Sequence, residues 1–347
     1  MSNSKIKNKK FPAELRMDLA SGDWIIVAPG RSKVRKNLKK SSRKKIIVSL
    51  KDCPFCNIKT QKKPTLIFSH GKKISLEGDI PDNWTTIVIP NLYPTIFSGN
   101  SLNERIEGGL YKRINAIGFH ELVITRNHNK SLAQLSLKSI KEVFDTYQDR
   151  YLFLAKQKFV NYISIFHNHG FEAGASQPHP HSQIMTTPLI DADLRNALSN
   201  SWKYYKKHKK CLYCEMSKWE KKTKKRIVFE NKDFLVICPF ASKFKFQIII
   251  SPKKHSSSFE KINEEEKWSL AEAFQQALTK LYKTLGDPSY NFYLHTAPCD
   301  NKNHNYYHWH WTIIPKTSIL GGFETGTRME VSAIEPEKAA EILRKQK

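Results

Sequence analysis

The sequence contains one long pattern twice, and this repeat limits the folds that the chain can adopt. Each copy holds a Cys-x-x-Cys pair, a strand-like segment followed by a histidine, a segment with helical spacing, a second strand-like segment and a His-x-His motif. The first copy comprises Cys53, Cys56, residues 121–125, His128, residues 135–158, residues 162–166, His179 and His181. The second copy comprises Cys211, Cys214, residues 247–250, His255, residues 263–285, residues 290–295, His308 and His310. Because corresponding histidines are 127 and 129 positions apart, we expect two related halves, residues 1–195 and 196–347.

Apolar spacing indicates what each half contains. Ile140, Val143, Phe144 and Tyr147 recur at intervals of three and four residues, as one face of a helix requires. The strand-like segments are rich in β-branched and aromatic residues and are bounded by Asn, Gly, Pro and His. We therefore predict an α+β fold in which each half is an antiparallel sheet with one long helix packed on it.

Four of the six cysteines form the two Cys-x-x-Cys pairs, and this spacing supplies half of a zinc site in a reducing compartment. A redox dithiol is the alternative, but it favours a strand-to-helix junction, whereas both pairs are expected in lysine-rich loops. The histidines of the repeat complete a Cys2His2 set in each half, so we predict one or two structural Zn²⁺ ions per chain. The ligands predicted for the first are Cys53, Cys56, His128 and His179. Those predicted for the second are Cys211, Cys214, His255 and either His308 or His310, of which the repeat favours His308.

The formal net charge of +26 raises the question of nucleic-acid binding. Nine Lys or Arg residues lie between Arg31 and Lys45 and eleven between Lys203 and Arg226, in segments that we expect to be loops. Such runs are more often solvated surface than a polyanion site. With 39% hydrophobic residues the chain is expected to be globular, and it has neither an apolar run of membrane-spanning length nor an apolar start. We predict a cytoplasmic protein that binds no membrane.

The chemistry is concentrated in residues 168–184. Gly174, Ala175 and Ser176 are small, so we expect their N–H groups to be free for phosphate oxygens. If the chain is extended from His179 onward, His179, His181 and Gln183 project from one face. A neutral His181 can attack phosphorus when its other ring nitrogen donates a hydrogen bond, and Gln183 can donate to a phosphoryl oxygen. The pattern indicates phosphoryl-group handling.

This segment resembles the active-site motif of the galactose-1-phosphate uridylyltransferase family, a branch of the histidine-triad superfamily in which two triad-like domains are fused. Residues 16–31, 53–56, 91–94 and 308–315 resemble further signatures of that family, so the resemblance covers nearly the whole chain. It implies two fused histidine-triad-like domains and a homodimer with active sites near the subunit interface.

The resemblance also implies roles for individual residues. His181 would be the nucleophile that forms a covalent nucleotidyl-histidine, while His179 would be a zinc ligand. Contacts to the nucleotide, the phosphates or the sugar are implied for Arg31, Asn91, Asn168, Ser176, Gln183, Phe323 and Glu324. The family has a second basic residue where Val34 stands, so Lys33 or Arg35 must supply that contact.

We therefore expect a ping-pong nucleotidyltransferase that exchanges a uridylyl group between UDP-glucose and a hexose 1-phosphate such as galactose 1-phosphate. Leu92 replaces an Asp that helps to hold the nucleotide in the best-known uridylyltransferases. Residues 91–94, the second cysteine pair and residues 322–327 look closer to a sister group that includes ADP-glucose phosphorylases, so adenylyl transfer to phosphate is the alternative. A histidine-triad hydrolase would carry a third His at Gln183. A zinc-ribbon protein that binds nucleic acid would leave the His-x-His-x-Gln row unexplained.

Overall fold

The structure is a computed structural model that describes residues 13–30 and 48–346. Arg31, Lys33 and Arg35, three of the predicted phosphate-binding residues, lie outside the described residues. Within the described part, none of the helices combines the length and the apolar character that a membrane span requires.

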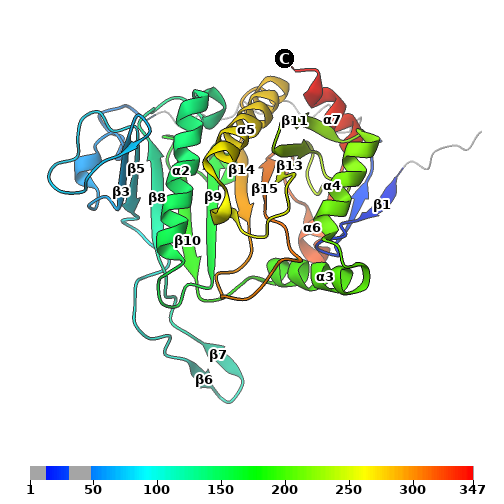
Figure 1. Ribbon diagram of the computed structural model, residues 1–347, viewed down its shortest axis with the longest axis horizontal. Helices are drawn as coiled ribbons and strands as arrows, with labels where there is room; N and C mark the ends of the chain where they lie inside the picture. Colours follow the sequence, from blue (N-terminus) through cyan, green and yellow to red (C-terminus); the bar gives the residue numbers. More distant parts are fainter. Residues whose placement is uncertain (1–12, 31–47, 347) are drawn as a thin grey trace, which may run out of the picture.

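One sheet of eleven strands runs through both halves of the chain (Figure 1). Its strands are β3 (Leu66–Ser69), β4 (Lys72–Lys73), β5 (Thr86–Pro90), β8 (His120–Thr125), β9 (Tyr162–His169), β10 (His181–Thr187), β11 (Ile227–Glu230), β12 (Phe234–Ile237), β13 (Ile248–Pro252), β14 (Tyr290–His295) and β15 (His310–Pro315). They lie in the order β11-β12-β13-β15-β14-β9-β10-β8-β5-β3-β4, and every neighbouring pair is antiparallel.

The repeat is visible in this order. Counted outward from the centre, β14, β15, β13 and β12 of the second half correspond to β9, β10, β8 and β5 of the first. The two halves join where β14 pairs with β9, with Asn291 opposite Asn168. The prediction of an α+β fold built from two triad-like halves is confirmed, and the structure adds that the two sheets are continuous.

Two smaller sheets and six α-helices complete the described chain. One smaller sheet contains β1 (Glu14–Met17), β2 (Trp24–Val27) and β16 (Val331–Ser332). The other contains β6 (Arg105–Glu107) and β7 (Tyr111–Arg113). The helices are α2 (Leu137–Leu154), α3 (Ala192–His208), α4 (Leu212–Thr223), α5 (Glu264–Leu285), α6 (Gly322–Thr327) and α7 (Pro336–Arg344). Single 3-10 turns are η1 (Ile58–Thr60), η2 (Leu132–Gln134), η3 (Phe171–Ala173) and η4 (Phe259–Lys261).

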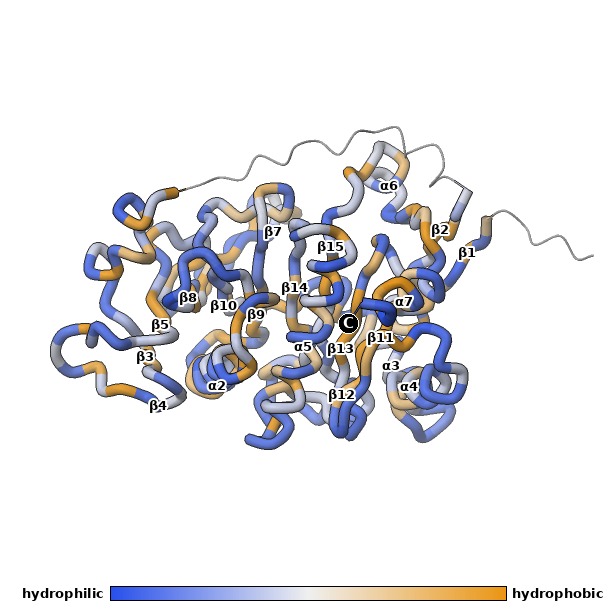
Figure 2. Tube along the Cα trace, turned by 90° about the horizontal axis from the view of Figure 1, so that it is seen from above, coloured by the Kyte–Doolittle hydropathy of each residue, from blue (hydrophilic) through white to orange (hydrophobic). Residues whose placement is uncertain are grey.

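The long helices α2 and α5 lie on the same face of the sheet (Figures 1 and 2). Their apolar sides share one core with alternate residues of the strands, among them Ile184 in β10 and Trp311 in β15. Asn263 caps α5 through a hydrogen bond from the N–H of Glu266, and Gly286 ends the helix with φ 71°. Because helices cover one face, the side chains that alternate with this core point to the opposite face.

The lysine-rich segment at 203–226 was expected to be loops, and this prediction is wrong. It forms the last part of α3, up to His208, and the whole of α4, because lysine favours helices and the few apolar positions fall on one side. Cys211 is the N-cap of α4, so the second cysteine pair opens a helix and does not lie in a loop. The predicted boundary between residues 195 and 196 falls inside α3.

Candidate functional site

Two clusters of cysteine and histidine side chains assemble from distant parts of the chain. The first contains Cys53, Cys56, His128 and His179, and the second contains Cys211, Cys214, His255 and His308. In each cluster the ligand atoms all lie within 4.8 Å of one another. The structure thus brings His308 to the second cluster, as the repeat favours, and leaves His310 outside it.

The geometry of both clusters suits a tetrahedral metal ion. Sγ of Cys56 lies 3.2 Å from Nδ1 of His128, and Sγ of Cys53 lies 3.5 Å from Nδ1 of His179. In the second cluster, Sγ of Cys214 lies 3.4 Å from Nδ1 of His255. Ligands at ordinary bond lengths around one tetrahedral ion would be separated by roughly 3.3–3.8 Å.

Hydrogen bonds behind the histidines fix which ring nitrogen faces the cluster. Nε2 of His179 donates to the carbonyl of Thr125 at 2.7 Å, and Nε2 of His308 donates to that of Pro252 at 2.9 Å. His128 and His255 make the same kind of bond to Val48 and Asn305. With the proton on Nε2, each Nδ1 lone pair is directed at the cluster, which is the usual arrangement of a metal-binding histidine. The residues therefore fit a bound metal ion in both halves.

His181 stands at the start of β10, two residues after the metal-cluster residue His179. Its Nδ1 lies 2.9 Å from the carbonyl oxygen of His179, so Nδ1 carries the proton and Nε2 keeps a free lone pair. Among the described residues, none forms a hydrogen bond with this Nε2. Phe55, from the first cysteine pair, packs edge-on against the His181 ring with 4.9 Å between centroids. The bond to the His179 carbonyl and the ring of Phe55 thus hold the His181 ring in place with its Nε2 lone pair free.

Burial supports the neutral state of His181. The residue is 7% exposed, and this burial lowers its pKa, although the hydrogen bond to the His179 carbonyl acts in the opposite direction. Burial likewise lowers the pKa of His179 to about 4. An unprotonated imidazole is the form that can attack phosphorus.

Two amide side chains flank His181. Asn168 lies at the end of β9, and its Oδ1 accepts a hydrogen bond of 2.8 Å from Asn291 of the second half. Gln183 follows His181 on the same face of β10, and its Oε1 lies 2.8 Å from Nε2 of His120. Because both amide oxygens are occupied, both NH2 groups are left to donate to a ligand at His181.

His120 was not predicted from the sequence. The N–H of Thr95 reaches its Nδ1 at 3.4 Å, so Nε2 carries the proton that Gln183 accepts. The side-chain nitrogen of Asn91 lies 3.1 Å from the same Nε2, which places Asn91 beside Gln183. Since His120 is 63 positions away from Gln183, only the pairing of β8 with β10 reveals the contact.

The loop before His179 differs from its prediction. The N–H groups of Gly174 and Ala175, which were expected to be free, donate to Phe171 and Gly170 and so close η3. The exposed Ser176 has no backbone N–H bond among the described hydrogen bonds. Gly174 adopts φ 83°, which explains glycine at this position. The loop therefore offers Ser176, and not three consecutive N–H groups, to a ligand.

Phe323 and Glu324 lie elsewhere, on the exposed helix α6. Glu324 accepts a hydrogen bond of 3.1 Å from the N–H of Gly321 and so caps its own helix. Within the described residues, neither side chain contacts His181 or the amides around it. The structure does not bring this pair into the site of its own chain.

An antiparallel strand pair that carries a His-x-His motif with a free imidazole nitrogen, repeated in two fused halves, places the fold in the histidine-triad class. The chain belongs to the galactose-1-phosphate uridyl transferase family: the N-terminal domain of that enzyme matches residues 4–191, and its C-terminal domain matches residues 197–345. The resemblance predicted from the motifs is thereby confirmed. The chain is accordingly an enzyme of the nucleotidyltransferase type.

Relatives of two kinds are similar over nearly the full length. ADP-glucose phosphorylase of Arabidopsis thaliana is 32% identical over 95% of this chain and 92% of its own. Galactose-1-phosphate uridylyltransferase of Thermotoga maritima is 28% identical over 95% of this chain and 98% of its own. The crystal structure of the A. thaliana phosphorylase with bound ADP-glucose superposes with a TM-score of 0.79, at 30% identity, over 96% of this chain and 99% of that one.

Proposed function

We propose that this protein is a UDP-glucose–hexose-1-phosphate uridylyltransferase with galactose 1-phosphate as its acceptor substrate. The observation that carries the proposal is the free Nε2 of His181, fixed by the bond from Nδ1 to His179 and flanked by the amides of Asn168 and Gln183. Full-length similarity to a uridylyltransferase supports the choice of substrates.

The reaction consists of two displacements at the same phosphorus atom. In the first, the Nε2 lone pair of His181 forms a bond to the α-phosphorus of UDP-glucose, and the bond from phosphorus to glucose 1-phosphate breaks. In the second, a phosphate oxygen of galactose 1-phosphate attacks phosphorus, and the bond to His181 breaks. Nδ1 keeps its proton throughout, and the His179 carbonyl stabilises the positive charge that the ring carries in the intermediate. The NH2 groups of Asn168 and Gln183 donate to the phosphoryl oxygens in both steps.

We propose that each Cys2His2 cluster binds Zn²⁺ in a structural role. Two thiolates and two imidazoles at tetrahedral spacing are a preferred donor set for zinc, and four protein ligands leave no position for substrate. In the first half the ion would join the turn at Cys53 to His179, which lies just before the strand that carries His181. The ion would thereby fix the nucleophile without taking part in the reaction.

We further propose a homodimer of cytoplasmic chains, each with the domains 1–195 and 196–347. The exposed position of Phe323 and Glu324 on α6 supports the dimer, since a sugar contact from this pair must then be made to the partner's site. The absence of disulfides among the described cysteines suits a reducing compartment.

A second candidate is adenylyl transfer from ADP-glucose to phosphate by the same histidine. The 32% identity to ADP-glucose phosphorylase and the replacement of an acidic residue by Leu92 favour it. The test compares turnover of UDP-glucose plus galactose 1-phosphate with turnover of ADP-glucose plus phosphate at equal enzyme concentration. We expect faster exchange with the uridine substrates. Faster turnover with the adenosine pair would replace the first proposal by the second, and turnover of neither pair would contradict both.

A further inference from the structure

A cavity of about 1010 Å³ lies over the second half of the sheet, on the face opposite α5. Its floor includes Tyr293, His295, His310 and Thr312 from β14 and β15. The turn between β1 and β2, together with α3 and α4, forms its walls. In the repeat this position corresponds to that of the His181 site in the first half, yet the proposed function makes no use of it.

His310 reproduces the setting of His181 within this cavity. Its Nδ1 lies 3.2 Å from the carbonyl oxygen of His308, as Nδ1 of His181 lies 2.9 Å from that of His179. Tyr213, at the third position of the second cysteine pair, packs against the His310 ring with 5.3 Å between centroids, as Phe55 does against His181. His310 is 7% exposed, and no described residue forms a hydrogen bond with its Nε2. A buried acceptor atom is therefore aimed into the cavity without a partner.

The surroundings of His310 do not suit a phosphate group. Thr312 stands where the first half has Gln183, and His295 pairs with His310 where the first half has Asn168. Neither replacement supplies an NH2 group. The carboxylates of Asp18, Asp193 and Glu330 also line the cavity and would repel a phosphate.

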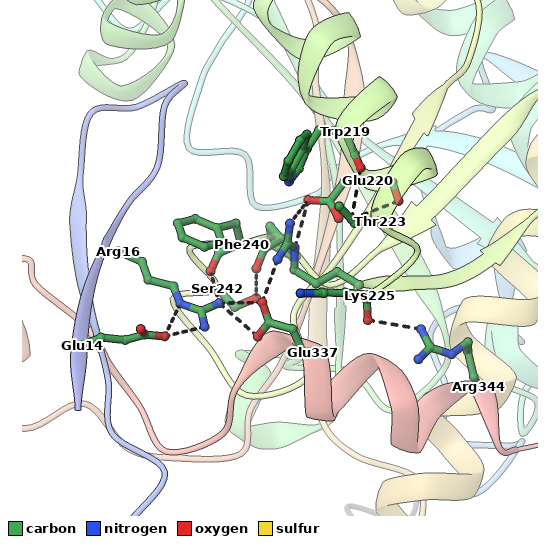
Figure 3. A network of polar contacts seen from close by, with 12 residues as sticks. Glu14, Arg16, Trp219, Glu220, Thr223, Lys225, Phe240, Ser242, Glu337 and Arg344 are labelled. Carbon is green, nitrogen blue, oxygen red and sulfur yellow. Dashed lines mark hydrogen bonds and ion pairs between the residues drawn. The ribbon is translucent and has the colours of Figure 1, made fainter. Parts of the chain in front are cut away.

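Other charged groups of the cavity are paired with one another. At its rim, Arg16 bonds to Glu337 (Figure 3). Arg226 bonds to Glu337 and to Glu220, so these charges largely neutralise one another. Inside, Nζ of Lys243 lies 2.7 Å from a carboxylate oxygen of Asp23. Donors and acceptors are thus interspersed, which favours a neutral ligand whose hydroxyl groups both donate and accept.

We propose that this cavity binds an unphosphorylated sugar ring, either a free hexose or the ribose of a nucleoside. Nε2 of His310 and the carboxylate of Asp193 accept hydrogen bonds from the hydroxyls, and Lys243 donates to a ring or hydroxyl oxygen. Tyr204 and Tyr293, which also line the cavity, offer aromatic faces to the C–H side of the ring.

The proposal is tested by ligand-detected NMR titration of the full chain with galactose, glucose, uridine and adenosine. We expect at least one of the four to bind with a Kd of about 1 mM or tighter. Binding of a hexose would identify the ring as a free sugar, and binding of a nucleoside would identify it as a ribose. His310→Leu removes the acceptor and Ala197→Phe fills the cavity from α3, so each is expected to weaken binding about tenfold.

Two controls separate this site from the catalytic one. Ser199→Phe adds the same bulk to the exposed side of α3 and is expected to leave binding unchanged, as is His181→Ala. If His310→Leu fails to fold, as judged by its metal content and melting temperature, Ala197→Phe carries the test. Binding by none of the four compounds, loss of binding in His181→Ala alone, or binding of spermidine or inorganic phosphate in place of the sugars would overturn the proposal.

Discussion

Oε1 of Gln183 accepts a hydrogen bond from Nε2 of His120 across the pair of strands β10 and β8. Because the oxygen is held by His120, the NH2 group of Gln183 is directed away from it and is available to the phosphoryl group at His181. An amide that rotated freely would present oxygen and nitrogen equally. His120 is therefore a positioning residue for the proposed reaction.

Removing this contact should slow the chemical step. We expect His120→Ala to reduce kcat by about 10- to 100-fold with a smaller change in KM for UDP-glucose. Gln183 then loses its fixed orientation but can still contact the phosphoryl group. His120→Gln keeps a side-chain N–H donor and should restore a large part of kcat. Equal kcat values for the Ala and Gln variants, or a loss explained by unfolding alone, would show that His120 is only structural.

The two Cys2His2 clusters should lose their metal ions independently. Cys56→Ser is expected to lower the metal content of the purified chain from two ions to one, and Cys214→Ser should do the same through the other cluster, because each removes one of four ligands. The metal is quantified by inductively coupled plasma mass spectrometry. Cys299→Ala, which changes a cysteine outside both clusters, serves as the control and should keep two ions. A full complement in either serine variant would be incompatible with these ligand sets.

A buried ion pair fixes α2 to the strand next to β10. Arg150 bonds to both carboxylate oxygens of Glu121 at 2.8 and 2.7 Å, and the two side chains are only 6% and 4% exposed. Arg150→Met should lower the free energy of unfolding by about 3–5 kcal/mol, because it leaves a buried carboxylate unpaired. Adding Glu121→Gln to that variant removes the charge and should recover part of the loss. Urea denaturation measures the free energy of unfolding of the single and the double variant. If the two substitutions lower it additively, the pair is not coupled.

Glu337 should make stability depend on pH. Burial raises the pKa of this carboxyl, but hydrogen bonds from its own backbone N–H, Arg226 and Arg16 outweigh burial and lower the pKa below its ordinary 4.5. Its contribution is therefore complete above pH 4.5 and is lost as the pH falls through the lower folded value. Near neutral pH, Glu337→Gln should cost about 1–2 kcal/mol. The difference in melting temperature from the parent protein should shrink below pH 4.5, and a constant difference would contradict this assignment.

Much of the fold and of the site could be predicted from local patterns, because the repeat places the same pattern in both halves of the chain. Both metal clusters follow from short spacings combined with the strand and helix order. The choice between His308 and His310 could not be made from strand geometry, since residues two apart on a strand share a face; it depended on the repeat. The contacts of Gln183 with His120 and of Asn168 with Asn291 depend on strand register, which alternation alone does not specify.

The remaining errors have physical causes. Lysine-rich segments resemble loops by composition, yet Leu194 and Leu198 give α3 a buried side while lysine covers the exposed one. The prediction of free N–H groups at Gly174 and Ala175 was wrong, because in this tight turn both N–H groups donate to carbonyl oxygens of their own loop. The cavity beside His310 is formed by segments from both ends of the chain, and no local pattern indicates it.

The covalent intermediate tests the central claim most directly. The protein is incubated with UDP-glucose labelled in the uracil ring, quenched in alkali, in which a phosphorus–nitrogen bond to histidine survives, and digested for peptide mapping. We predict that the label resides on the peptide containing His181, is released by galactose 1-phosphate, and is absent from His181→Ala with unchanged metal content. Turnover without retained label, or label retained by His181→Ala, would contradict the account.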